Sequence, residues 1–205
     1  FAPQPGKIFE VYDRIALGGV GHPADVERLR MNLLDMAHLE GFNRSAQDVT
    51  SARLLQFGIA PALKQNFEEI QRAPYIIRML LVELDNEGKP NFFRMNYDGH
   101  WETFKNGTAI AGEEKVMDWL QTEIQKQPFA TYSLDQALKQ ACKLWDESRK
   151  LETDDEAKKD IPETLQEAFD QWYLEGAVLT EKSIRKAIYR PLSKSEIERL
   201  KSSAF

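Results

Sequence analysis

The sequence predicts an α+β fold in which helices cover the outside of a sheet sandwich. Apolar residues alternate with polar ones in several short segments, and elsewhere they recur at spacings of three and four. These segments come in runs, with pairs of helices between groups of strands, and a layered sandwich is the simplest arrangement that buries every apolar face. The 205 residues can bury one sizeable core, so a single domain is expected over residues 1–205.

The chain is expected to start with two short strands and a helix. Residues 7–13 alternate apolar and polar side chains, and residues 14–21 continue as a run of apolar and small residues. A helix should begin near Asp25, an acidic residue suited to a helix N-terminus, and end at Gly41. Its apolar residues fall on one face: Val26, Leu29, Leu33, Met36 and Ala37.

A second helix is expected soon after the first. Ser45 or Asp48 provides a start signal, and Pro61 should kink or shorten the helix because proline has no backbone N–H. The apolar stripe of this helix consists of Ala52, Leu55, Ile59 and Leu63. Two adjacent amphipathic helices need a common apolar floor, which the following strands can provide.

A group of strands follows. Residues 75–84 are almost all apolar and rich in strand-forming side chains, which predicts a central strand covered on both faces. A turn at residues 86–90 leads to a returning strand over residues 91–97. Asp98 and Gly99 mark the next turn, and extended chain is expected as far as residue 111.

Two more helices are predicted in the second half of the chain. The first runs from Glu113 to near Pro128, and the second covers residues 133–149 with Ser133 as its cap. The expected apolar stripes are Val116, Trp119, Leu120 and Ile124 in the first helix, and Leu134, Ala137, Leu138, Ala141 and Trp145 in the second. A single cysteine cannot pair within the chain, which excludes a disulfide scaffold and favours a reducing compartment. This residue, Cys142, should behave as a small apolar residue in its helix.

The C-terminal part combines a charged segment with further short elements. Residues 151–160 are charged and nearly free of large apolar side chains, as in a solvated linker or an exposed helix. One amphipathic helix is predicted over residues 161–172, with Pro162 in its first turn. Two strands over residues 175–180 and 183–189 should follow, and then a closing helix over residues 193–201 with a Ser193–Glu196 capping box.

Composition excludes several classes of function. The net charge of −6 argues against a nucleic-acid surface, and no window is apolar enough for a membrane span. The opening FAPQPGK lacks the apolar segment of a signal peptide and an initiator methionine, so we expect it to be a cut edge. Proteins or peptides are therefore the expected partners, without nucleic acid or membrane.

No local motif predicts an active site. The three histidines, His22, His38 and His100, stand far apart and lack ligand spacing, so neither a metal nor another cofactor is expected. The glycine-rich residues 17–21 lack the lysine of a phosphate-binding loop and suggest close packing of strands instead. Carboxylates are scattered, and no nucleophile elbow is present.

Taken together, six segments in order closely resemble the α-type subunits of proteasomes, with actinobacterial and archaeal forms as the nearest relatives. The segments are KIFEVYDRIALGGVG, DVT, PYIIRMLLVEL, FFRMNYDG, TFKNGTAIAGEEKVMDWL and LEGAVLTEKSIRKAIYRPLSKSEIERLK. The resemblance implies the N-terminal-nucleophile hydrolase fold, a four-layer αββα sandwich, assembled in heptameric rings. It leaves residues 151–171 as an insertion, and it implies a gating helix and two strands upstream that are missing from the given sequence.

The resemblance also separates two roles. The resemblance implies that catalytic β-type subunits begin with a threonine. Its hydroxyl attacks the substrate, its α-amine serves as the base, and a lysine lies nearby. Here residue 1 is Phe1, the first threonine is Thr50 in a predicted helix, and residues 1–6 contain no lysine. A non-catalytic α-type role is therefore expected. The alternatives are a β-type threonine peptidase subunit whose nucleophile lies outside the given sequence, and a solitary adaptor domain that has lost ring assembly.

For an α-type subunit, the resemblance assigns partner binding to Lys7. This residue occupies the place of the family's pocket lysine, which lies between ring neighbours and receives the C-terminal carboxylate of an activating AAA ATPase ring. His22 occupies a neighbouring pocket position where relatives commonly have an apolar residue. The expected partners are other copies of the chain, catalytic β-type subunits and the ATPase, and the expected location is the cytoplasm.

Overall fold

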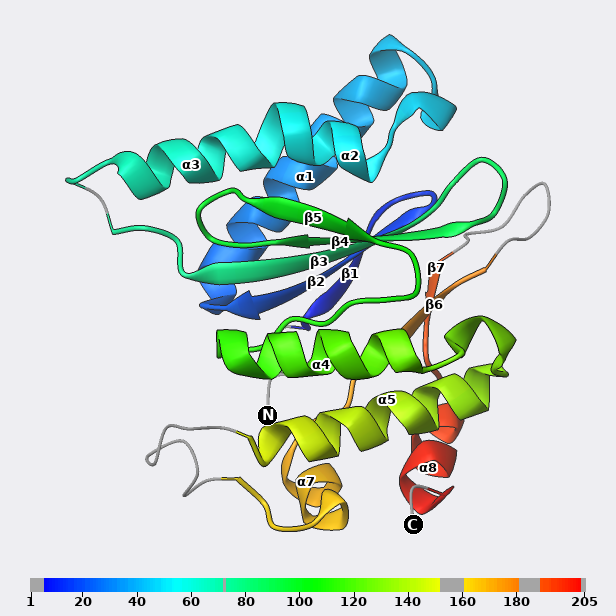
Figure 1. The fold of residues 1–205 in the computed structure, drawn as a ribbon. Coiled ribbons are helices and arrows are strands. Elements are labelled where there is room, and N and C mark those ends of the chain that lie inside the picture. The colour runs from blue at the N-terminus through cyan, green and yellow to red at the C-terminus, as the bar shows by residue number, and fades with distance from the viewer. Residues whose placement is uncertain (1–5, 72, 152–160, 181–188, 204–205) are drawn as a thin grey trace. The chain divides into compact units, whose positions relative to one another are not determined.

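A computed structural model describes residues 6–71, 73–151, 161–180 and 189–203 of the chain (Figure 1). It divides into two compact units. Unit 1 comprises Phe1–Ile110 with Ala177–Arg190, and unit 2 comprises Ala111–Gly176 with Pro191–Phe205. Among the described residues, no helix is both long and apolar enough to cross a membrane. Each unit is considered separately below.

Unit 1 is built on a five-stranded antiparallel sheet in the order β1-β2-β3-β4-β5, which confirms the expected strands. The strands are β1 (Ile8–Tyr12), β2 (Ile15–Gly21), β3 (Ile77–Leu84), β4 (Pro90–Met95) and β5 (Trp101–Phe104). The extended chain expected up to residue 111 forms a strand only as far as Phe104. Alternate residues of β3 are buried and the others half-buried, so one face is fully covered and the opposite face in part.

Helices cover one face of this sheet (Figure 1). They are α1 (Pro23–Asn43), α2 (Ser51–Leu54), a π-helical turn (Leu55–Ile59) and α3 (Ala60–Glu68). The predicted apolar stripes of these helices face a shared core with the strands. Core residues from the helices include Leu29, Leu33, Leu55 and Leu63, and those from the sheet include Ile15, Leu17, Met79, Leu81 and Met95.

Gly41 does not end the first helix, contrary to the sequence prediction. α1 continues through it to Asn43. A Cβ atom at this position would overlap the hydroxyl of Tyr12, a residue of β1. The glycine is therefore explained by the close approach of a strand side chain to α1, and not by a helix C-terminus.

The second helix also differs from the prediction at its start and near Pro61. Thr50 caps α2, whereas Ser45 and Asp48 bond to each other around a separate 3-10 turn (Ala46–Asp48). The helical run continues past Pro61, because this proline lies in the first turn of α3, where a missing N–H costs little. The departure from regular α-helical geometry occurs in the π-helical turn immediately before α3.

Unit 2 is helical in its described part. It contains α4 (Glu114–Lys126), α5 (Leu134–Arg149), α7 (Leu165–Gln171) and α8 (Lys194–Ser203). The Ser133 cap of α5 is confirmed, with Gln136 completing a capping box, and so is the Ser193–Glu196 pair before α8. In α4 the predicted stripe is buried except for Trp119, which is half-buried, while Met117 is buried.

The predicted apolar stripe of α5 is wrong in most positions. Leu134, Ala141 and Trp145 are exposed, whereas the buried residues are Cys142, Leu144, Ser148 and Arg149. Cys142 packs against Phe169 and Leu200 of the neighbouring helices. Arg149 is buried because Asp146 and the carbonyl of Pro162 accept bonds from its guanidinium. A charged residue in the interior is not visible in a hydrophobic pattern.

The remaining predictions in the C-terminal part are partly confirmed. α7 begins after Thr164, which forms a capping box with Glu167, so Pro162 lies before the helix and not in its first turn. The two final strands pair as β6 (Ala177–Leu179) and β7 (Tyr189–Pro191). The predicted linker at residues 152–160 and strand residues 183–188 lie outside the described residues.

Candidate functional site

The two residues predicted to bind a partner, Lys7 and His22, lie at the same end of the β1–β2 hairpin. β1 begins one residue after Lys7, and β2 ends one residue before His22. The strands run antiparallel, and the backbone N–H of Gly19 donates to the carbonyl of Lys7 at 3.1 Å. Both side chains are exposed. The structure therefore places them at one solvent-facing edge of unit 1.

Glycines in β2 allow α1 to start close to this edge. A Cβ at Gly19 would lie 2.7 Å from a methyl group of Val26 in α1. Gly21 has φ of +141°, and a Cβ there would lie 2.5 Å from the carbonyl oxygen of Ile76. The small residues thus permit close packing of backbone and helix, the role expected for residues 17–21.

His22 has a structural role that sequence reasoning missed. It is the N-cap of α1: its Nδ1 accepts a hydrogen bond from the N–H of Ala24 at 3.3 Å, and Pro23 occupies the first helical turn. Because Nδ1 is the acceptor in this arrangement, we assign the ring proton of neutral His22 to Nε2. The His-Pro dipeptide before Asp25 is the sequence signal for this helix start.

The arrangement is suited to an acceptor such as a carboxylate. The Lys7 ammonium is a cationic donor, and the Nε2–H assigned to His22 is a second donor from the same edge.

Two candidate nucleophiles, Thr50 and Cys142, are poorly suited to attack a substrate. Thr50 is the N-cap of α2, and its hydroxyl accepts from the N–H of Arg53. Burial raises the pKa of the Cys142 thiol to about 11, which keeps it protonated and poorly nucleophilic near neutral pH. Within the ranges that the structure describes, no group of three or more His, Cys, Asp or Glu side chains could hold a metal ion.

Two buried charged residues of the sheet were also missed by sequence reasoning. Glu83 of β3 accepts from the backbone N–H of Ser51 at 2.7 Å. Arg94 of β4 pairs with Glu102 of β5 at 2.7 Å and lies over the ring of Phe104. Their presence in apolar strands was the available signal. Both make contacts within unit 1 and act as structural residues there.

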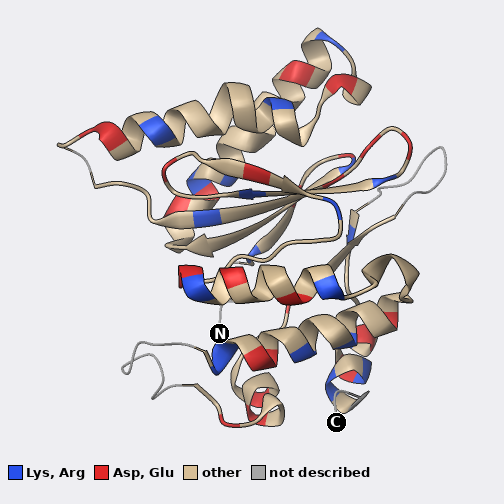
Figure 2. Ribbon diagram, viewed as in Figure 1, with Lys and Arg blue, Asp and Glu red and all other residues tan. Residues whose placement is uncertain are grey.

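The helices of unit 1 expose large apolar side chains, several of them aromatic. These are Met31, Leu39, Phe42, Phe57 and Phe67, followed by Ile70 just after α3. Phe42 is 88% exposed and Ile70 fully exposed. Residues of both charge signs are interspersed along the helices of each unit (Figure 2). Exposed apolar groups of this size are typical of surfaces that other proteins cover.

Comparison with known proteins agrees with these observations. Residues 2–164 match the model of the proteasome subunit family. The chain is 32% identical to the proteasome subunit alpha of Streptosporangium roseum over 121 residues, which are 57% of this chain and 46% of the relative. It is also 32% identical to the proteasome subunit alpha of Parafrankia sp. over 128 residues, 61% of this chain and 52% of the relative.

A third relative, the proteasome subunit alpha of Acidothermus cellulolyticus, is 32% identical over 108 residues, 52% of this chain and 46% of that protein. The chain thus spans about half the length of the curated relatives that it matches. The family model, by contrast, covers most of the chain. The resemblance inferred from the ordered segments is confirmed: the chain belongs to the proteasome subunit family.

Proposed function

We propose that the chain is a non-catalytic α-type subunit of a proteasome core particle, in the outer ring that gates substrate entry and docks an activating ATPase. The observation that carries this proposal is the similarity to relatives named as α subunits. The proposal includes the four-layer αββα sandwich, as one domain over residues 1–205 with an insertion at residues 151–171. It also places the particle in the cytoplasm.

The chemistry of the described residues supports the non-catalytic role. The hydroxyl of Thr50 caps a helix, and its backbone nitrogen lies in a peptide bond, so Thr50 cannot act as a threonine nucleophile with a free α-amine. The Cys142 thiol is buried and protonated. Lys7 and His22 present two donors at one edge, which suits binding of a carboxylate terminus from the ATPase.

The exposed apolar residues support assembly. Phe42, Phe57 and Ile70 expose most of their surface to water, at a free-energy cost that burial against other subunits would remove. In the proposal, the subunits bound are other copies of the chain in a ring, a heptamer by the family resemblance, and catalytic β-type subunits stacked on that ring.

Electron microscopy and native mass spectrometry of the full native protein, alone and co-expressed with its β-type subunit, test the assembly. Rings without peptidase activity when the chain is alone, and active particles with the β-type subunit, are expected. A monomer under both conditions would favour the solitary adaptor. Intrinsic peptidase activity, or a mature N-terminal threonine found by protein sequencing, would favour the β-type alternative.

The partner site is tested by Lys7→Glu. This change should weaken ATPase docking, because it places a carboxylate against the incoming carboxylate, and should leave ring assembly unchanged. Lys115→Glu is the matched control, since Lys115 is exposed in the first turn of α4. Unchanged ATPase affinity of Lys7→Glu rings would show that Lys7 is an ordinary polar strand residue.

A further inference from the structure

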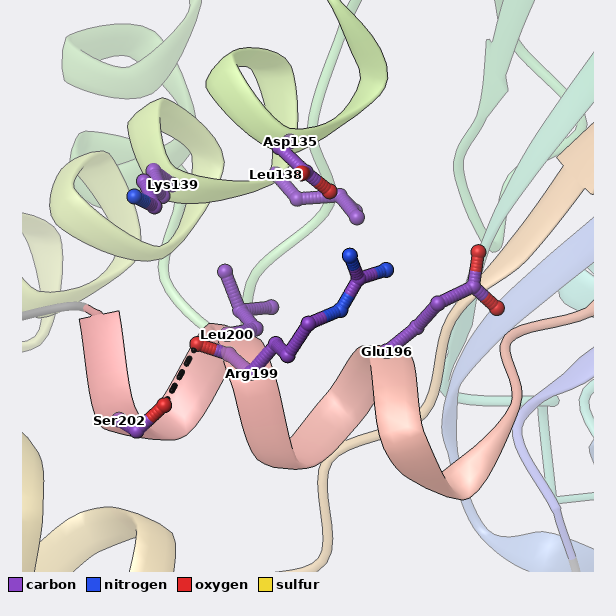
Figure 3. Close-up of a pocket in the computed structure, with 7 residues that line it drawn as sticks. All are labelled: Asp135, Leu138, Lys139, Glu196, Arg199, Leu200 and Ser202. Carbon is purple, nitrogen blue, oxygen red and sulfur yellow. Dashed lines mark hydrogen bonds between the residues drawn. The ribbon is translucent and has the colours of Figure 1, made fainter.

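Unit 2 contains a small pocket between α5 and α8 (Figure 3). Its volume is about 230 Å³. Asp135, Leu138 and Lys139 contribute from α5, and Glu196, Arg199, Leu200 and Ser202 contribute from α8. The pocket shares no residue with the edge formed by Lys7 and His22, so its role is separate from the proposed ATPase site.

The floor of the pocket is apolar. Leu200 is 5% exposed and belongs to the core of unit 2 with Cys142 and Phe169, and Leu138 is half-buried against that core. The two leucines come from helices packed against each other, so their positions are set by the core and need no ligand. A bound molecule would therefore find a preformed apolar surface.

The rim of the pocket includes Arg199, whose guanidinium stabilises no other described part of the fold through a hydrogen bond or ion pair. Figure 3 shows the Arg199 side chain directed from α8 toward α5. Its neighbour one turn earlier, Glu196, accepts from the N–H and hydroxyl of Ser193 in the helix cap. Across the described residues, the Arg199 guanidinium and the Lys139 ammonium have no hydrogen-bond or ion-pair partner. Arg199 thus offers a cationic donor beside the leucine floor, whereas Figure 3 draws the Lys139 side chain on the other side of Leu200, directed away from the Arg199 guanidinium.

The charges and volume restrict the ligand. Asp135 and Glu196 also line the pocket, so a doubly charged phosphate would face two carboxylates, whereas a monoanion can reach Arg199 with less repulsion. A guanidinium binds a carboxylate through two parallel hydrogen bonds. A volume of about 230 Å³ is well above the minimum that one water molecule needs, so the pocket can admit a small organic molecule.

We propose that this pocket binds a small apolar monocarboxylate, with the carboxylate on Arg199 and the aliphatic part on Leu138 and Leu200. This chemistry is shared by free branched-chain acids and by the C-terminal residue of a peptide ending in an aliphatic side chain. In the second case, the exposed Asp135 carboxylate accepts the N–H of the terminal residue.

Methyl NMR of the full chain, with labelled leucines, tests the pocket directly. The probes are 4-methylpentanoate, its neutral analogue 4-methylpentanamide, acetate, and the tripeptide Ala-Ala-Leu. Shifts of the Leu138 and Leu200 methyl groups should saturate with 4-methylpentanoate at dissociation constants on the order of millimolar, because the charged groups are exposed. The amide and acetate should bind several-fold more weakly, since each lacks one of the two contacts.

Two variants locate the contact. Arg199→Gln should weaken binding about three- to tenfold, and Lys139→Gln should weaken it less, because the Lys139 ammonium is directed away from Arg199 and acts only as a nearby charge. Lys143→Gln is the control, since Lys143 lies on the same helix outside the pocket and should bind like the unmodified chain. The side chains changed are exposed, so all three variants should fold.

The outcomes distinguish free acids from peptide C-termini as the ligand and test the proposal. Tighter binding of Ala-Ala-Leu than of 4-methylpentanoate assigns the pocket to peptide C-termini, and weaker binding of the tripeptide assigns it to free acids. Equal binding of acid and amide, unchanged binding by Arg199→Gln, or absence of methyl shifts at tens of millimolar 4-methylpentanoate would overturn the proposal.

Discussion

The carboxylate of Glu83 accepts a hydrogen bond of 2.7 Å from the backbone N–H of Ser51, which joins the central strand β3 to the first residue of α2. Glu83 is 5% exposed and Ser51 is fully buried. The N–H groups at the start of a helix have no partner within the helix, and a carboxylate placed there meets this need. A charged residue in an apolar strand thereby sets where the second helix begins.

Glu83→Ala is expected to destabilise the chain by about 2–3 kcal/mol, because the Ser51 N–H would be left buried without its acceptor. Glu83→Gln keeps an acceptor oxygen and should lose less. Urea unfolding followed by circular dichroism gives both values. Similar losses for the two variants would mean that the hydrogen bond is not the source of the effect.

Gly41→Ala is expected to destabilise the chain, although alanine in a helix is normally more stable than glycine by about 1 kcal/mol. The reason is the overlap of the new Cβ with the hydroxyl of Tyr12. Tyr12→Phe in the same chain removes that hydroxyl and should restore part of the loss in thermal unfolding. Gly112→Ala is the control, because no atom lies within 4 Å of its Cβ position. A stabilised Gly41→Ala variant would contradict the close contact.

The Asp146 carboxylate should make stability depend on acidity. Burial raises the pKa of this group, but hydrogen bonds from Lys150 and Arg149 outweigh burial and hold the pKa below its ordinary value of 3.8. A carboxyl group with a lowered folded-state pKa adds stability above its unfolded pKa and loses it as the pH falls through the folded value. The contribution is therefore present at pH 7, begins to be lost below about pH 4 and is fully lost only below the folded-state pKa.

Asp146→Asn isolates this effect. The variant should be less stable than the unmodified chain in urea at pH 7, and the difference should shrink at pH 3. Asp118→Asn, an exposed change on α4, serves as the control. A stability difference that stays the same between pH 7 and pH 3 would exclude ionisation of Asp146 as its cause.

Cys142 should resist thiol reagents in the folded chain. Burial raises the pKa of its thiol to about 11, so little thiolate is present at pH 8, and the side chain is 8% exposed. Labelling with a disulfide reagent should be slow at pH 8 and fast in urea. Since Cys142 is the single cysteine, the amount of label reports this site alone. Fast labelling of the folded chain would show that α5 opens readily.

Most helices and strands could be predicted because their patterns are local. The alternation in residues 7–21 predicted β1 and β2, and the Ser133 and Ser193 caps predicted the starts of α5 and α8. The ordered segments also predicted the family, which the family match confirmed. The partner residues Lys7 and His22 were chosen from the resemblance, and their role stays a prediction.

Two of the errors depend on residues that are distant in sequence. From sequence alone, Gly41 is typical of a helix C-terminus, and only the close approach of Tyr12 explains the glycine within α1. The buried side of α5 is decided by Phe169, Leu200 and the carbonyl of Pro162, none of which lies in that helix.

The sequence by itself determined the order of strands and helices, their apolar periodicity and the family. These properties follow from side-chain spacing and from the order of local segments along one chain. Only the tertiary structure decided that Glu83 accepts from the first N–H of α2, that His22 caps α1 and that Arg199 borders an apolar pocket. Burial and hydrogen-bond partners depend on which distant residues come into contact when the chain folds. The spacing of residues along the chain does not specify these contacts.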